Sequence, residues 1–336
     1  MVAAKEGDLA TLEEVIACPD VDYETKNDLG QTPIHIASQQ GQLEVVRALL
    51  NKTNADINAA NDWGRTPLNK ASINGHLGVV REILNAPNIS VNTADNWGRM
   101  PLHAALWYGH PEVVRALLQH PDIEVNSVDA QNRTSLHWAS WNGQLDIVQD
   151  LLSSPNIDVN IHDKYGTTPL HWASYMGHLN VVQALLNSPN TEINAVEKDG
   201  DTSLHHASFK GYLNIVQVLL NEPNITVNPV DENGRTPLYW ASNNGHHDVV
   251  LQLLGTPNID VNAATKHGET PLYSACLNRH LNVVRDLLLC PKTDMTVICH
   301  GKTALEVAQS EEQMEIVEAM ETRNEMLESG GNLCPY

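Results

Sequence analysis

The sequence predicts an all-α solenoid of stacked helix–turn–helix units, joined by β-hairpin-like finger loops. Three observations over the 336 residues support this fold class. A four-residue motif, first found at 32–35, returns every 34 residues as far as 270–273, and a glycine follows each copy at a fixed spacing as far as Gly245. Apolar residues then recur at helical spacing. Such a period is the signature of repeat units that pack only against their neighbours.

The elements of each unit follow from its residues in chain order. Thr168 caps the first helix through its hydroxyl, and Pro169 at the first helical position loses no hydrogen bond. We expect this helix to end at Gly177, because glycine accepts the left-handed conformation after a helix. A second, apolar helix covers 179–186, and Pro189 ends it. An extended segment then leads to a glycine turn, which forms the finger.

These motifs resemble the ankyrin repeat, and the resemblance runs from Ala3 to about Met320. The matching segments of one unit are Thr168–His171, Gly177–Leu179, Val181–Val182 and Leu185–Leu186, and the Asp-Val-Asn segment is seen at Asp158–Asn160. The family has a usual period of 33 residues. In this chain a Pro-Asn-Ile segment replaces the usual Gly-Ala, so we expect a changed loop and an unchanged fold.

The repeat boundaries predict four parts. Residues 1–30 form an N-terminal half repeat or cap, 31–301 hold eight ankyrin repeats of 34 residues, 302–328 form a C-terminal capping repeat, and 329–336 form a disordered tail. The segment 3–7 matches the end of a first helix. The first unit is therefore either a truncated cap or the point at which a longer protein was cut.

Composition and charge narrow the location and the partners. The formal net charge of −21 opposes binding to nucleic acid and to anionic membranes. The sequence has no apolar run of membrane-spanning length and no signal peptide. Its five scattered cysteines fit a reducing compartment. We expect an intracellular chain, cytoplasmic or also nuclear, that is a monomer by itself and binds another protein or peptide.

The sequence carries no catalytic or cofactor signature, so we expect no enzyme, no cofactor and no metal site. The G-x-S-x-G, Walker, dinucleotide and H-E-x-x-H motifs are absent. Five histidines share one repeat position: His35, His103, His137, His171 and His205. Stacked helices lie roughly 8–10 Å apart, too far for the roughly 2.0–2.1 Å Zn–N bonds of one zinc site. We interpret these histidines as buried imidazoles that bridge adjacent turns.

The aromatic residues are sorted onto one helix face and onto the finger tips. All seven tryptophans lie in first helices or one residue before a turn glycine. In the ankyrin family, which the chain resembles, that helix face lines the concave surface. The residues expected to bind the partner are Trp63, Arg65, Trp97, Arg99, Trp107, Tyr108, Arg133, Trp138, Trp141, Trp172, Tyr175, Met176, Phe209 and Trp240. Packing is the competing interpretation for Trp138, Trp172 and Trp240, and greater exposure is expected for Trp107, Trp141, Tyr175 and Phe209.

Arginine occupies the position after the turn glycine, or after Asn132 in its place, in four units: Arg65, Arg99, Arg133 and Arg235. In the ankyrin family this position borders the groove. One interpretation is a basic rim that suits a partner with acidic residues. In the other, each arginine pairs with Asp or Glu in a nearby turn. The sequence leaves both open.

The predicted function is a non-catalytic protein–protein interaction scaffold, which binds its partner through an aromatic-rich concave groove and the finger loops. One alternative is a fragment of a larger multidomain signalling or ubiquitin-ligase adaptor protein. Another is a substrate of the asparaginyl hydroxylase that modifies ankyrin proteins, since L-x5-[DE]-[VI]-N segments end at Asn58, Asn126, Asn160, Asn194 and Asn262. A third is a groove for a glycan or a small aromatic molecule, against which the openness of a solenoid argues.

Overall fold

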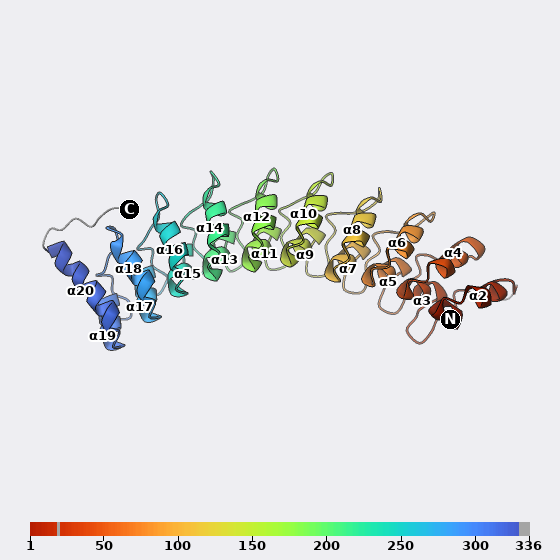
Figure 1. The fold of residues 1–336 in the computed structure, drawn as a ribbon, viewed down its shortest axis with the longest axis horizontal. Coiled ribbons are helices and arrows are strands. Elements are labelled where there is room, and N and C mark those ends of the chain that lie inside the picture. Colours follow the sequence, from red (N-terminus) through yellow and green to blue (C-terminus); the bar gives the residue numbers. More distant parts are fainter. Residues whose placement is uncertain (19–20, 329–336) are drawn as a thin grey trace. The chain divides into compact units, whose positions relative to one another are not determined.

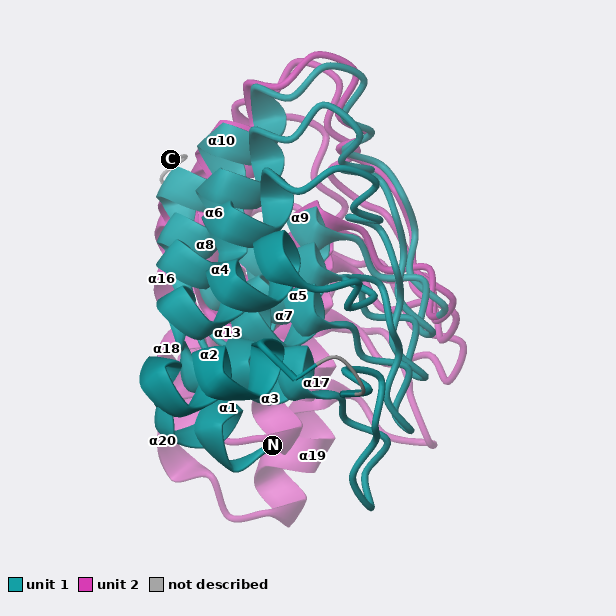
Figure 2. Cartoon of the chain, turned by 90° about the vertical axis from the view of Figure 1, so that its right-hand side faces the viewer, with its two compact units in different colours: residues 1–164 teal, residues 165–336 magenta. Residues whose placement is uncertain are grey.

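The computed structural model describes residues 1–18 and 21–328, and the tail expected at 329–336 lies outside the described residues. The described residues form twenty α-helices. The chain divides into two compact units, unit 1 (Met1–Lys164) and unit 2 (Tyr165–Tyr336). Figure 2 shows that in each unit the helices gather on one side and the finger loops on the other. The predicted all-α repeat fold is confirmed.

Unit 1 is built from five consecutive helix pairs (Figure 1). Its helices are α1 (Val2–Glu6), α2 (Leu9–Ile16), α3 (Pro33–Gln40), α4 (Leu43–Lys52), α5 (Pro67–Ile73), α6 (Leu77–Leu84), α7 (Pro101–Trp107), α8 (Pro111–Leu118), α9 (Ser135–Asn142) and α10 (Leu145–Leu152). Each first helix packs on the next first helix, as α3 does on α5, and each second helix on the next second helix, as α4 does on α6. Two parallel layers of helices result.

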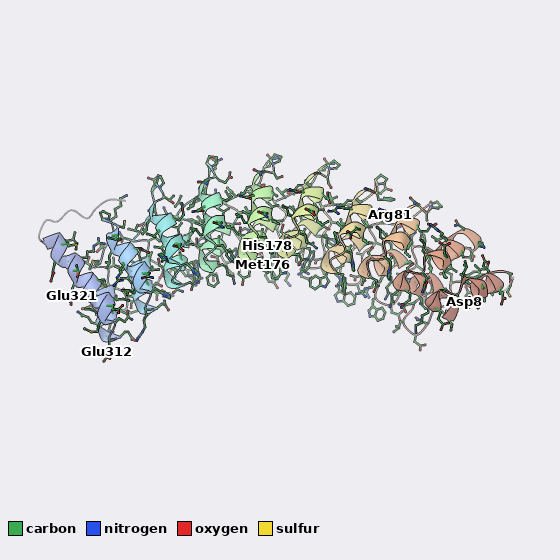
Figure 3. The ribbon with its side chains drawn as sticks, viewed as in Figure 1. Asp8, Arg81, Met176, His178, Glu312 and Glu321 are labelled. Carbon is green, nitrogen blue, oxygen red and sulfur yellow. The ribbon has the colours of Figure 1, made fainter. Side chains whose placement is uncertain are left out.

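Unit 2 repeats the same plan with five further pairs. Its helices are α11 (Pro169–Met176), α12 (Leu179–Leu186), α13 (Ser203–Lys210), α14 (Leu213–Leu220), α15 (Pro237–Asn243), α16 (His247–Leu254), α17 (Pro271–Leu277), α18 (Leu281–Leu289), α19 (Ala304–Ser310) and α20 (Met314–Glu328). The first-helix layer runs from α11 to α19, and the second-helix layer from α12 to α20. Met176 and His178, labelled in Figure 3, mark the turn between α11 and α12.

The histidines at the third position of α3 and α13 each link two repeats. The backbone N–H of Thr32 donates to His35 Nδ1 (3.2 Å), so the ring proton lies on Nε2, which donates to the Arg65 carbonyl of the next finger (3.0 Å). His205 makes the same link to the Arg235 carbonyl (3.0 Å). The interpretation of these histidines as bridges between turns is confirmed for both. Burial lowers the pKa of His35 and of His205 to about 4.

The core lies between the two helix layers and is almost entirely aliphatic. Each of the four second helices from α4 to α10 places one large side chain fully inside unit 1: Leu49, Ile83, Leu117 and Leu151. Burying one such side chain contributes about 1.5–3 kcal/mol. The helix pair turns tightly because Gly41 adopts φ +74°, where a Cβ would lie 2.6 Å from His76 Nδ1. Aliphatic side chains therefore fill most of this interior, and Trp138 is the tryptophan of unit 1 that is also buried.

The fingers are short hairpins joined to one another by backbone hydrogen bonds. Within a finger the ends of the turn pair, as in Asp95 N–H to the Arg99 carbonyl (2.9 Å). Between neighbouring fingers one bond recurs, for example from Asn96 N–H to the Trp63 carbonyl (2.9 Å). The β-hairpin-like fingers expected from the sequence are present in this form, and they hold the finger tips at a fixed spacing.

A ladder of asparagine side chains joins the Pro-Asn-Ile loop of each repeat to the repeat before it. Asn126 Nδ2 donates to the Asn156 carbonyl of the next repeat (2.7 Å), and Asn126 Oδ1 accepts from Asp158 N–H (2.9 Å). Asn156 adopts φ +62°, which turns the Pro-Asn-Ile loop so that both backbone groups face the amide. The same pair of bonds is made by Asn58 and Asn92 in unit 1 and by Asn194, Asn228 and Asn262 in unit 2. The loop is changed, as expected, and the fold is not.

Asn126→Asp tests the ladder. The carboxylate still accepts from Asp158 but cannot donate, and its charge repels the Asn156 carbonyl. We expect the free energy of unfolding at pH 7 to fall by about 1–2 kcal/mol, measured by urea denaturation. The control is Asn54→Asp at an exposed asparagine outside the ladder. Equal stability of the two variants would contradict a structural role for the ladder.

Acid is expected to destabilise the fold through the buried histidines. The pKa of His35 is about 4 when folded and about 6.5 when unfolded, so its contribution is complete above pH 6.5 and is lost as the pH falls toward 4. In one repeat Asn69 takes the histidine's place and accepts from Thr66 N–H (2.9 Å). His35→Asn should therefore fold at pH 7 and lose on the order of 1–2 kcal/mol less than the wild type between pH 7 and pH 5. Identical pH dependence of the two melting curves would refute this assignment.

Candidate functional site

The aromatic surface of unit 1 consists of Trp63, Trp97, Trp107, Tyr108, Trp138 and Trp141. Trp63 and Trp97 stand at finger tips, Trp107 and Tyr108 end α7, and Trp138 and Trp141 lie in α9. Trp107 is 48 % exposed, and Tyr108 and Trp97 are each 46 % exposed. Trp63 and Trp141 are half-buried. The expected exposure holds for Trp107 and is smaller for Trp141.

Trp138 is a support for this surface and contributes almost none of its area. It is only 8 % exposed. The Trp107 ring meets it edge-on, with centroids 4.3 Å apart, and the Arg133 guanidinium carbon lies 4.1 Å from its ring centroid. Packing, the competing interpretation for this residue, therefore describes its position, and its ring fixes that of the exposed Trp107.

Buried aspartates hold the finger arginines against the tryptophans. Asp95 Oδ2 accepts from Arg99 (2.9 Å) and lies 3.3 Å from Arg65 Nε. Both guanidinium carbons lie over the ring of Trp97, at 4.9 Å and 5.2 Å from its centroid. A cation this close to an indole face is attracted to it. Trp97 thus stays exposed in a fixed orientation.

The same clamp recurs in later fingers. Asp129 is fully buried and pairs with Arg133 (2.8 Å), and Asp231 pairs with Arg235 (2.6 Å), which also lies 4.2 Å from the Trp240 centroid. Burial raises the pKa of Asp129, but hydrogen bonds from the Arg133 side chain and backbone outweigh it and hold that pKa below the ordinary value. Of the two interpretations that the sequence left open, pairing with nearby acids is the one observed. Arg133 and Arg235 each pair with an aspartate of their own, whereas Arg65 and Arg99 share the carboxylate of Asp95.

The aromatic surface of unit 2 consists of Trp172, Tyr175, Met176, Phe209 and Trp240. All five side chains are half-buried. Phe209 meets Trp240 edge-on with centroids 5.1 Å apart, and the Lys210 ammonium lies 4.2 Å from the Tyr175 centroid. This surface is less exposed than that of unit 1, and a cation already covers part of it.

The finger that ends at Asp201 lacks the clamp. Asp201 stands in the position that arginine occupies in four other fingers, and Glu197 stands where Asp95, Asp129 or Asp231 would be. Glu197 accepts from Thr167 Oγ1 (3.1 Å) and lies 3.5 Å from His206 Nε2. The sequence interpretation missed Asp201, although an acidic residue in the arginine series was visible.

The Asp201 carboxylate is largely buried and has no hydrogen-bond donor on its inner oxygen. Its side chain is 18 % exposed, and Oδ1 is buried without a partner. His205 Nδ1 lies 3.9 Å away but already accepts from Thr202 N–H, so it has no proton to donate. Burial raises the pKa of Asp201 to about 6. The group is therefore a poorly stabilised anion at neutral pH.

Within residues 1–18 and 21–328, no three His, Cys, Asp or Glu side chains are arranged to hold a metal ion. Over the same ranges no helix has both the length and the apolar character needed to cross a bilayer.

Most of the chain matches a model of a known protein family. A family model described as "Ankyrin repeats (3 copies)" matches residues 1–95, 88–163, 136–231, 190–265 and 223–299. These matches overlap and together run over most of the chain. A search of curated proteins gives no match.

Asp201→Asn is expected to stabilise unit 2. The pKa of Asp201 is raised from 3.8 to about 6 on folding, so its charge destabilises the folded state as the pH rises through 6, and has little effect below 3.8. Removing it should raise the free energy of unfolding by about 1–3 kcal/mol at pH 7 and far less at pH 4. Urea denaturation at both pH values measures this.

Asp231→Asn is the matched comparison, because Asp231 is fully buried and paired with Arg235. It should destabilise the protein at pH 7. A loss of stability in Asp201→Asn similar to that in Asp231→Asn would show that Asp201 has a structural partner.

Proposed function

Since the chain belongs to the ankyrin-repeat family, we propose that it is a non-catalytic scaffold that binds a partner protein or peptide through its aromatic surfaces and finger loops. Ankyrin repeats generally mediate protein–protein interaction and are typically non-catalytic modules. The finer statement, that the aromatic surfaces bind the partner, is supported by the geometry of unit 1.

The exposure of rigid aromatic rings is the observation that carries this proposal. Trp97, Trp107 and Tyr108 each leave nearly half of their surface in solvent. Aliphatic side chains fill the core, so these three rings are not required for its packing. Trp97 is held by two arginines and Trp107 by Trp138. Rings fixed before binding lose little conformational entropy on binding, and Trp and Tyr are enriched among residues that dominate interface energies.

The asparagine ladder accounts for the residues that suggested a hydroxylase substrate. Asn126 and Asn194 use both ends of their amides in hydrogen bonds to the next repeat. This structural role explains an asparagine at these positions without modification. No contact of the described residues favours the hydroxylase alternative over it.

The double variant Trp107→Ala/Tyr108→Ala tests the scaffold proposal. Partners are captured on immobilised protein from cell extract and quantified by mass spectrometry, and the leading partner is then purified and titrated. We expect at least a tenfold loss of affinity, because hot-spot aromatic residues contribute about 2 kcal/mol or more. The far-UV circular dichroism and the melting temperature should stay close to those of the wild type.

Leu277→Ala supplies the control. Leu277 occupies the repeat position of Trp107 in a later unit and is also 48 % exposed, but lies outside both aromatic surfaces. Its affinity should match the wild type. If the double variant bound the partner as tightly as Leu277→Ala, the aromatic surface of unit 1 would not be the binding site.

A further inference from the structure

The repeats of this chain can be compared with one another. One finger position holds arginine in four repeats, and it holds an acid at Asp201 and at Glu269. In the finger of Arg235 the guanidinium pairs with Asp231 (2.6 Å) and covers the Trp240 ring (4.2 Å). Arg133 makes the equivalent contacts with Asp129 and Trp138. In the finger that ends at Asp201, an acid replaces the arginine, so this finger supplies no guanidinium of its own.

A cavity of about 210 Å³ lies beside Asp201. It is lined by Tyr175, Asp201, His205, His206, Phe209 and Trp240. A water molecule takes a share of roughly 30 Å³ in the liquid, so the cavity has room for a side chain. Five of its six lining residues have aromatic rings, and the carboxylate of Asp201 provides its negative charge.

Three carboxylates lie around this cavity, those of Glu197, Asp201 and Asp231. His206 and Arg235 favour the charged form of Asp201, while Asp231 and Glu197 oppose it. Arg235 is already paired with Asp231 (2.6 Å), His206 Nε2 lies 3.5 Å from Glu197, and the Lys210 ammonium lies 4.2 Å from the Tyr175 centroid. The Asp201 carboxylate has none of these groups as a hydrogen-bonded partner. A cation that enters the cavity would supply one.

We propose that this cavity binds an arginine side chain of the partner, with the guanidinium on Asp201 and against the aromatic walls. This inference rests on the proposed function and gives the partner a chemistry, namely a segment with an exposed arginine. Guanidinium is preferred over ammonium because it is planar, stacks on aromatic rings and can bind a carboxylate through two N–H groups. Arg235 in the next finger is an example of this arrangement, since it pairs with Asp231 (2.6 Å) and lies 4.2 Å from the Trp240 centroid.

The test uses the full chain at pH 7.5 and physiological salt, with three acetylated and amidated peptides of alternating glycine and one second residue. That residue is arginine, lysine or citrulline, the neutral isostere of arginine. Isothermal titration calorimetry should give the tightest binding for the arginine peptide, at least threefold weaker binding for lysine and at least tenfold weaker binding for citrulline. Equal affinity for arginine and lysine would reduce the site to non-specific attraction by an acidic protein and overturn the proposal.

Variants separate the cavity from the general negative charge. Asp201→Asn and Asp201→Arg should each weaken the arginine peptide at least tenfold, the second because it supplies the missing guanidinium internally. Glu269→Gln is the matched control: Glu269 holds the same repeat position but accepts from Tyr239 Oη (2.8 Å), and its loss should change affinity less than twofold. Equal effects of Asp201→Asn and Glu269→Gln would refute the site, and circular dichroism checks that each variant is folded.

Failure here is distinct from failure of the proposed function. If the scaffold binds its partner through the Trp107 surface while no arginine peptide is recognised, only the cavity assignment is wrong. Loss of partner binding in Asp201→Asn but not in Glu269→Gln would support both the scaffold function and the arginine site.

Discussion

The hydrogen bonds that join each repeat to the next are the constraint on which the structure depends. His35 reaches the carbonyl of Arg65, and Asn126 reaches that of Asn156, in both cases 30 residues further along the chain. Each donor lies on one repeat and its acceptor on the next repeat. A repeat of different length would therefore shift the acceptors relative to their donors. The unvarying 34-residue step between 32 and 270 is the sequence expression of this geometry.

In the same geometry, the residues that stabilise the repeats are different from those proposed to bind the partner. Side chains such as Leu117 and Leu151 fill the space between the helix layers, while the fingers place Trp97 outside it. The Asp95 carboxylate, which is nearly buried, holds two arginines against that ring. A surface indole would otherwise rotate freely and lose entropy on binding. The salt bridges therefore matter more for the orientation of the ring than for the net charge of the surface.

The local and periodic features of this chain could be predicted from sequence. The start of α11 at Pro169, its C-cap at Gly177 and the bridging role of His35 each depend on a few residues at fixed spacing. The burial of Trp138 could not, because it depends on the ring of Trp107 from the preceding repeat. The pairing of the arginines stayed open for the same reason, since Arg65 reaches an acid 30 residues away. The partner-binding role of these residues remains a proposal.

The unusual environment of Asp201 is recognised by comparing its finger with the fingers of the other repeats. Asp95, Asp129, Asp231 and Glu269 are acids in neighbouring finger positions, and each has a hydrogen-bonded partner within its own or an adjacent finger. A buried carboxylate without a hydrogen-bonded partner costs free energy. Four other fingers have an arginine at the position of Asp201. A cation bound at Asp201 would compensate this charge. The proposed arginine site therefore follows from a departure from the internal pattern of the repeats, and not from the exposure of a side chain.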